Sequence, residues 1–299
     1  MMTKGLNAYK EGRFEIAVPA FECVISEDAD LQKLHAEFYL ARIYGDETSG
    51  FVDHFNAYML FLGLADKADG VDPDDTRQAA YIAKAVTAVA GYVRRGLPAS
   101  GLKPDMERAV EYYRTAATVF NEPDAQFELA KLYLTGIGVP KDVKLGLHYI
   151  QKLVQDSHPG AQAYLADLYW RGMHVPVDRT KAFALIKLAM ENATPSDRLW
   201  IEDSYQSIYC GTATADRSRA GEIASAYRKI FARSYAADRS PLGQPTMLGR
   251  SPTMTRACGN GEPIEMNTRG DLAAPPLATT LTDQQPQKTS PAGVRTPVR

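Results

Sequence analysis

The chain has 299 residues, of which 45% are hydrophobic, so it is long enough for one large or two ordinary domains with a substantial core. Its 34 basic residues nearly balance 36 acidic ones, and the formal net charge of −2 argues against a nucleic-acid-binding arm or a polybasic membrane patch. The longest apolar run, residues 57–65, is far shorter than the about 20 residues that a transmembrane helix needs, so no membrane span is expected.

The first residues predict a helix pair of the tetratricopeptide type. Small and aromatic residues recur at helical spacing around a turn glycine: Gly5, Ala8, Tyr9, Gly12, Ala17 and Phe21. Helical sequence begins almost at Met1, without a charged stretch followed by an apolar one. No secretory signal peptide is therefore visible in the chain.

A second helix pair is predicted over residues 36–64, and an acidic run follows it at residues 72–75. The run resembles half of a cation-binding loop or an acid/base pair, but no glycine-centred calcium loop follows. A helical pattern over residues 76–92 comes directly after it. We therefore expect Asp72 to be the N-cap of that helix, Pro73 its first residue, and Asp74 and Asp75 charges in its first turn.

Three further copies of the same pattern follow. Residues 85–116 form a copy with a long turn at residues 97–104. Residues 125–136 (AQFELAKLYLTG) and 161–172 (AQAYLADLYWRG) share seven of 12 residues and lie 36 positions apart, and the copy at residues 36–64 lies 89 positions before the first of them. A fixed period of this size predicts an all-α, right-handed solenoid of five or six stacked antiparallel helix pairs, which usually offers an extended binding surface.

The repeated positions have structural explanations. A small residue lets helices approach closely, a tyrosine fills the space between them, a glycine ends the first helix, and an aspartate caps the second. Pro140 and Pro176 prevent the first helix from continuing. We assign eight residues to these structural roles: Ala130, Tyr133, Gly136, Asp142, Ala166, Tyr169, Gly172 and Asp178.

The repeat domain is predicted to span residues 1–233, and residues 234–299 to be a disordered tail. Residues 197–232 resemble a final, atypical helix pair, as expected at the end of a repeat array. The tail holds nine of the 18 prolines and almost no aromatic residues, so it cannot bury enough apolar surface to fold. Cys23, Cys210 and Cys258 are isolated and odd in number, which predicts free thiols instead of a zinc site or a disulfide framework.

No catalytic, cofactor-binding or metal site is predicted. The five histidines have no metal-ligand spacing and are interpreted as surface residues: His35, His54, His148, His158 and His174. No nucleophile elbow, phosphate-binding loop or dinucleotide fingerprint is present, and Gly136–Ile137–Gly138 is explained by its place between two helices.

One aromatic cluster is a candidate for partner binding. Tyr169, Trp170 and Arg171 are consecutive in a predicted helix, so about 100° separates each from the next and they cannot all face the core. Tryptophan and arginine dominate protein-binding hot spots. An exposed Trp170 or Arg171 would therefore be a plausible anchor for a partner.

The pattern A-x4-A-x-[LI]-Y-x2-G-x-G-V-x2-D-x3-[AG] resembles the Sel1-like repeat, a relative of the tetratricopeptide repeat. The match is specific for residues 125–193, good for 36–64 and looser for 85–117. From residue 5 to about 232 the chain also resembles the bacterial exopolysaccharide-production negative regulators (ExoR). That resemblance rests on Gly5–Ala8–Tyr9, Ala109–Val110–Glu111–Tyr112–Tyr113, residues 124–130 and residues 199–205.

The second resemblance implies a non-catalytic regulator that binds and restrains a membrane sensor histidine kinase from the periplasm. It also implies export behind a cleaved leader, which requires a start upstream of Met1. A genuine start at Met1 would favour a cytoplasmic location and an assembly scaffold. A third reading is an enzyme with β-lactam-related activity, as reported for some Sel1-repeat proteins. Those members pair cysteines regularly within each repeat, and this chain lacks such pairs.

Overall fold

The computed structural model describes residues 1–27, 30–75, 77–194, 197–235 and 258. These residues form twelve α-helices and two short 3-10 helices, together with one isolated antiparallel bridge between Leu97 and Leu102. The α-helices are α1 (Met2–Lys10), α2 (Phe14–Ser26), α3 (Asp30–Tyr44), α4 (His54–Ala65), α5 (Ala79–Arg95), α6 (Met106–Thr118), α7 (Pro123–Thr135), α8 (Val143–Gln155), α9 (Pro159–Arg171), α10 (Arg179–Asn192), α11 (Arg198–Gly211) and α12 (Thr214–Tyr235). The 3-10 helices are Ala68–Gly70 and Pro98–Ser100.

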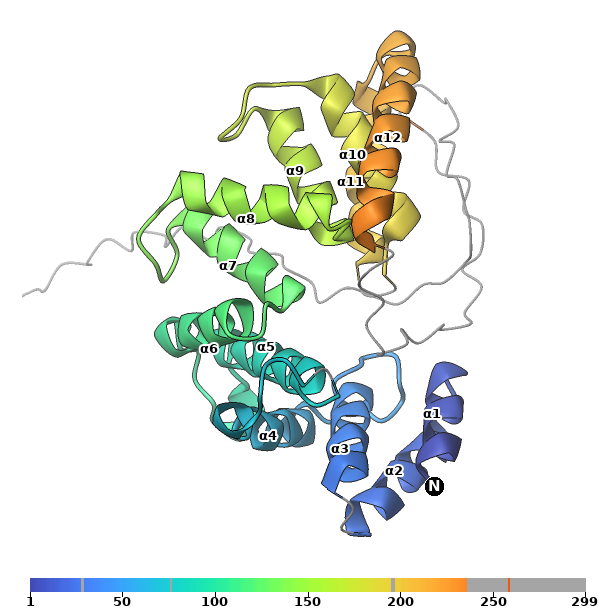
Figure 1. The fold of residues 1–299 in the computed structure, drawn as a ribbon, viewed down its shortest axis with the longest axis vertical. Helices are drawn as coiled ribbons and strands as arrows, with labels where there is room; N and C mark the ends of the chain where they lie inside the picture. The colour runs from blue at the N-terminus through green and yellow to red at the C-terminus, as the bar shows by residue number, and fades with distance from the viewer. Residues whose placement is uncertain (28–29, 76, 195–196, 236–257, 259–299) are drawn as a thin grey trace, which may run out of the picture.

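The helices stack in consecutive pairs, and from α1 to α11 each packs on the next. In Figure 1 the stack follows a C-shaped path that brings α1 and α12 to the same side of the view. The final pair is atypical, because α12 packs against α10. The predicted all-α class and stack of helix pairs are confirmed. Within the described residues, no helix is long and apolar enough to cross a bilayer.

The turn between the helices of a pair is built in the same way four times. Asp53, Asp105, Asp142 and Asp178 each cap the second helix by accepting a hydrogen bond from the backbone N–H three residues on, at 2.9–3.0 Å. Each also donates its own backbone N–H to a carbonyl near the end of the first helix, at 2.8–3.0 Å. The aspartate thus ties both helices of a pair together and satisfies a backbone group on each.

Removing one of these caps should have a measurable effect. We expect Asp142→Ala to lower the free energy of unfolding by about 1 kcal/mol, because Leu145 loses the acceptor for its N–H. Asp142→Asn keeps an acceptor oxygen and should lie within a few tenths of a kcal/mol of the parent, roughly the difference between good caps. Urea titration of the three proteins checks this expectation, and an equal loss in both variants would contradict it.

Small residues and glycines occupy the positions that the period predicts. Ala130 and Ala166 are fully buried, and Tyr133 and Tyr169 are partly buried against the apolar clusters. Gly136 and Gly172 end α7 and α9 in the left-handed conformation, with φ of 80° and 71°, where a Cβ atom would be strained.

The apolar core runs through the stack as two clusters of buried side chains, and α7 contributes to both. Leu129 and Leu132 of α7 pack in the cluster formed by α1 to α6. Phe127, Ala130 and Leu134 pack in the cluster formed with α8 to α12. Helix α7 therefore joins the two halves of the stack.

The expected start of α5 was wrong. This helix begins at Ala79, and its N-cap Gln78 makes no side-chain capping hydrogen bond. Asp72 instead accepts the N–H of Asp74, and Asp75 accepts the N–H of Arg77. These local side-chain-to-backbone bonds satisfy the amide groups in turns and compete with helix formation, so the acidic run stays outside the helix.

The expectation of three free thiols was also wrong. Cys210 of α11 forms a disulfide with Cys258, which is buried, while Cys23 is a free thiol. A sequence separation of 48 residues and the absence of a CxxC spacing concealed this pair. Apart from Cys258 and the end of α12, the expected disordered tail at 234–299 lies outside the described residues.

Candidate functional site: the first-helix face

The first helices of successive pairs lie beside one another, and charged side chains connect their N-terminal ends. Glu122 is the N-cap of α7 and accepts the N–H of Ala125 at 2.8 Å, while its other oxygen lies 3.1 Å from Lys84 Nζ of α5. The Glu122 side chain is 3% exposed. Lys84 also lies 3.7 Å from Asp124 in the first turn of α7. One ammonium group therefore serves two carboxylates across the α5–α7 junction.

His158 repeats the role of Glu122 at the next junction, 36 residues later. Its Nδ1 accepts the N–H of Ala161 and caps α9, and its Nε2 lies 3.0 Å from Asp124 Oδ1. Because Nδ1 accepts a hydrogen bond, the proton of the neutral ring is assigned to Nε2, which donates to Asp124. The side chain is 11% exposed, so the interpretation of His158 as a surface residue was wrong.

Burial and mutual charge interactions shift the pKa values of the residues in this polar cluster. Burial raises the pKa of Glu122, and the charge of Asp124 adds to this against the opposing charge of Lys84. Partial desolvation opposes ionisation of Asp124, but Lys84 and His158 outweigh it and hold the pKa of Asp124 well below its usual range. Burial alone would lower the pKa of His158, whereas the hydrogen bond and charge of Asp124 raise it above 6.5. The charged form is therefore favoured at Asp124. At His158 the same interaction raises the pKa, but protonation of Nδ1 would remove the acceptor for the N–H of Ala161.

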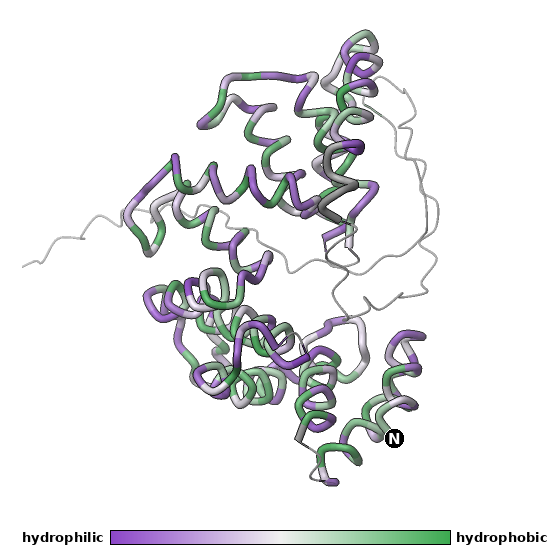
Figure 2. The backbone as a smooth tube through the Cα atoms, in the orientation of Figure 1, coloured by the Kyte–Doolittle hydropathy of each residue, from purple (hydrophilic) through white to green (hydrophobic). Residues whose placement is uncertain are grey.

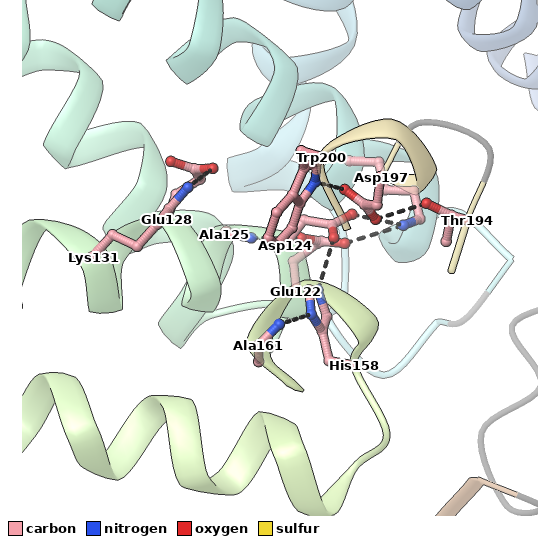
Figure 3. A network of polar contacts seen from close by, with 11 residues as sticks. Glu122, Asp124, Ala125, Glu128, Lys131, His158, Ala161, Thr194, Asp197 and Trp200 are labelled. Atoms are coloured by element: carbon pink, nitrogen blue, oxygen red, sulfur yellow. Dashed lines mark hydrogen bonds and ion pairs between the residues drawn. The ribbon is translucent and has the colours of Figure 1, made fainter. Parts of the chain in front are cut away.

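The start of α11 extends this network. Thr194 donates its hydroxyl to Asp197 at 2.7 Å, and Trp200 donates its indole N–H to the same carboxylate at 3.3 Å. Figure 3 shows Asp197 and Trp200 beside Asp124, Glu122 and His158, although they lie far apart in the sequence. Four consecutive first helices, α5, α7, α9 and α11, thus meet at one polar cluster.

The stability contributed by His158 should depend on pH. The pKa of His158 is raised in the folded protein, so its ion pair with Asp124 stabilises below about pH 6.5 and is lost as the pH rises through the folded value. The protonated ring no longer accepts the N–H of Ala161 at Nδ1, and this loss offsets part of the gain at low pH. His158→Asn keeps an N-cap acceptor but carries no charge. We expect the stability of the parent relative to this variant to fall between about pH 6 and pH 8, by less than about 1 kcal/mol because Asp124 is exposed. Urea titrations at both pH values measure the difference, and a constant difference would contradict the assignment.

A second feature lies toward the other end of α9. A cleft of about 370 Å³ between α9 and α11 is lined by seven residues: Asp167, Trp170, Arg171, Asp203, Ser204, Ser207 and Ile208. Trp170 is half-buried, and its ring packs so closely on α11 that a Cβ atom at Gly211 would lie 2.5 Å from it. Arg179 lies 5.3 Å from the centroid of the Trp170 ring. Trp170 therefore forms an apolar wall beside charged and hydroxyl groups.

The three residues expected to bind a partner are separated by this geometry. Trp170 and Arg171 both line the cleft, and Arg171 is 63% exposed while it bonds Asp167 at 2.7 Å. Tyr169 packs against the core and lies under Lys181 of α10, 5.4 Å from its ring centroid. A role of Tyr169, Trp170 and Arg171 in partner binding stays a prediction.

Further paired charges lie on α5 and α7. Arg94 of α5 lies 2.9 Å from Glu128, and Lys131 lies 2.6 Å from the same carboxylate. We define the first-helix face as this cleft, the polar cluster and the Arg94–Glu128–Lys131 group, all of which lie on first helices or at their N-terminal ends. Its charges are largely paired within the molecule, and Trp170 and Arg171 are its large side chains at the cleft. Among the described residues, no group of three or more His, Cys, Asp or Glu could hold a metal ion.

Sequence reasoning missed Lys84, Glu122 and Asp124 and misjudged His158. A local signal existed, because Glu122 and His158 both directly precede a proline and stand 36 residues apart. That spacing predicts the same place at the start of a helix, since proline favours the first helical position. The contact of both with residues from α5 and α11 depends on stacking, which the local sequence does not report.

These features define an all-α helical repeat protein with a polar face built from its first helices. The Sel1 repeat family model matches residues 83–118, 123–157 and 159–192, so the chain contains three Sel1 repeats, in the pairs α5–α6, α7–α8 and α9–α10. The expected copy at residues 36–64 lies outside these matches. The turn of this copy differs from that of the matched repeats at α7–α8 and α9–α10. Its glycine with positive φ, Gly50, precedes the capping aspartate Asp53 by three residues, whereas Gly136 and Gly172 precede theirs by six.

Two curated relatives are each named "Exopolysaccharide production negative regulator". The protein of Rhizobium meliloti is 28% identical over 154 residues, 52% of this chain and 55% of the relative. The protein of Rhizobium leguminosarum bv. viciae is 29% identical over 151 residues, which are 50% of this chain and 54% of the relative. The chain thus spans about half the length of the curated relatives it matches.

Two solved structures share the fold. A Sel1 repeat protein from Oxalobacter formigenes superposes with a TM-score of 0.51 and 19% identity over 78% of this chain and 84% of its own. A protective antigen of uropathogenic Escherichia coli with an SLR fold superposes with a TM-score of 0.51 and 20% identity, over 80% of this chain and 46% of its own. At this identity the likeness concerns the fold alone.

Proposed function

We propose that this protein is a non-catalytic regulator that restrains exopolysaccharide production by binding a protein partner on its first-helix face. The single observation that carries the binding role is the cleft between α9 and α11, where Trp170 stands beside the exposed Arg171. A half-buried tryptophan next to arginine is the composition of an interface hot spot. The regulatory part is supported by the names of the two relatives.

The proposed partner is the sensor domain of a membrane histidine kinase, which the resemblance to the regulator family implies. The paired charges along α7 are already satisfied, so they would contribute orientation and selectivity more than affinity. The aromatic wall at Trp170 would supply most of the binding energy.

The proposed location is the periplasm. Disulfides persist in oxidising compartments and are rare in the cytosol, so the Cys210–Cys258 bond supports this location. Alkylation of the protein in intact cells, before and after reduction, reports the state of the two cysteines. Protection from alkylation until reductant is added is expected, and freely alkylated Cys210 and Cys258 would count against a periplasmic location.

A gene deletion tests the regulatory role. Loss of the protein should raise exopolysaccharide output, and a plasmid copy should restore the parental level. An Arg171→Glu copy should restore it less well, because the reversed charge stands exposed at the cleft. Unchanged polysaccharide in the deletion strain would overturn the proposal. Full complementation by Arg171→Glu would show that the partner binds elsewhere than at the cleft.

A further inference from the structure

An exposed apolar patch lies on α4, outside the first-helix face and outside the three matched Sel1 repeats. Phe55 is 50% exposed and Met59 47% exposed, one helical turn apart, and Phe51 and Val52 are exposed directly before the helix. Helix α4 contains no Asp, Glu, Lys or Arg over its 12 residues, and Figure 2 colours it largely as hydrophobic. A helix that is apolar all round is normally buried on every side.

The repeat register shows that these positions are unusual. The residues 89 positions after Phe55 and Met59 are Lys144 and His148, which are exposed on α8. On α6 the places two and six residues after the capping aspartate hold Glu107 and Glu111, both exposed. The second helices α6 and α8 thus present charged or polar side chains outward at these positions. Helix α4 presents phenylalanine and methionine instead.

Helix α10 shows what covers an apolar second helix in this protein. At the position equivalent to Met59, α10 carries Ala184, which is fully buried. Helix α12 packs on α10, and its Ala220 and Ala224 are buried in the same apolar cluster. An ion pair between Arg228 of α12 and Glu191 of α10 fixes this arrangement. An amphipathic helix therefore covers α10, and within the described residues α4 has no such cover.

The charge around α4 indicates what kind of helix would fit. From Asp46 to Asp75 the chain carries eight acidic residues and one lysine, and they flank both ends of α4. Lys67 is already paired with Glu37 at 3.3 Å and Arg77 with Asp75 at 3.4 Å, which leaves Arg108 of α6, near Tyr58, as a further cation close to α4. Acidic residues before and after an apolar helix disfavour contact with a second copy of that helix or with an anionic lipid surface, and they favour a cationic partner.

We propose that α4 docks an amphipathic helix of a protein partner whose apolar stripe is flanked by lysine and arginine. Phe55 and Met59 bind the apolar stripe, and the acidic residues at both ends of α4 bind its basic flanks. This surface is separate from the cleft between α9 and α11, so it offers a second contact to the same partner or a first contact to another.

The test uses the full chain and a synthetic helical peptide of about 20 residues, roughly 30 Å long, with a leucine stripe flanked by lysines. A matched peptide carries glutamate in place of lysine. Binding is measured by fluorescence anisotropy at about 0.15 M salt, where exposed charges more than about 8 Å apart are largely screened. Amide deuterium exchange then locates the peptide on the protein.

We expect the lysine peptide to bind, to slow exchange in α4, and to bind the Phe55→Ser/Met59→Ser variant about tenfold or more weakly. The control variant Ile137→Ser/Met173→Ser removes two other exposed apolar residues and should bind as the parent does. Because all four side chains are exposed, the variants should keep the parental melting temperature.

Several results would overturn the proposal. The first is equal affinity for the glutamate and the lysine peptides. The second is slowed amide exchange outside α4, and the third is unchanged affinity of the Phe55→Ser/Met59→Ser variant for the lysine peptide. Dimerisation of the parent that this variant abolishes would assign the patch to a second copy. Binding to anionic vesicles that the same variant abolishes would assign it to lipid.

Discussion

We expect the Lys84→Met substitution to lower the free energy of unfolding by about 2–3 kcal/mol. Lys84 provides the positive charge that faces both Glu122 and Asp124, and the Glu122 side chain is almost completely buried. Without Lys84, Glu122 keeps its cap on α7 but loses its ion pair, and Asp124 repels it. The magnitude is below that of a fully buried pair because Lys84 is 35% exposed.

Two controls make this expectation specific. Adding Glu122→Gln to Lys84→Met should recover about half or more of the lost stability, because glutamine keeps an oxygen for the N–H of Ala125 without a buried charge. Lys131→Met removes a lysine whose partner Glu128 is partly exposed and should cost less than about 1 kcal/mol. Urea unfolding of the four proteins gives the comparison. Equal losses for Lys84→Met and Lys131→Met would contradict a special role for Lys84.

Leu168→Ala should lower the free energy of unfolding by about 3 kcal/mol, within the range of roughly 2–5 for buried leucines. Leu168 is fully buried in α9, in the cluster that α7 to α12 share. Truncation leaves a cavity between helices that are held apart by other side chains, so the neighbouring residues close it only partly.

The matched control is Ile137→Ala, because Ile137 is apolar but 48% exposed in the turn after α7. Its effect should stay within about 0.5 kcal/mol. Thermal and chemical unfolding of both variants measure the difference. A loss below about 1 kcal/mol for Leu168→Ala would mean that α9 does not pack as described.

The repeat could be predicted from the sequence because each repeated residue acts locally. Asp142 and Asp178 cap the helices that they immediately precede, and Gly136 and Gly172 end helices at a conformation that favours glycine. A period of 36 residues then carries these local structures along the chain. The same logic failed at Asp72, where a side-chain bond to the N–H two residues on replaces the expected cap.

The polar cluster and the disulfide could not be predicted in the same way. Lys84 and Asp124 are 40 residues apart, and their contact depends on how α7 stacks on α5. Cys210 and Cys258 are 48 residues apart, and Cys258 lies beyond the last predicted helix pair, where the repeat gives no information about position. The apolar face of α4 was visible in the sequence as the longest apolar run, but its exposure follows from the position of the helix in the stack.

The proposed function depends on binding of a protein partner in the cleft between α9 and α11. Isothermal titration of the purified full chain against the proposed kinase sensor domain tests it most directly, with Trp170→Ala and Arg171→Glu as variants and melting temperatures as the folding check. We expect binding that each variant weakens about tenfold or more, while Ile137→Ala leaves it unchanged. Equal affinity of the parent, Trp170→Ala and Arg171→Glu would contradict the claim.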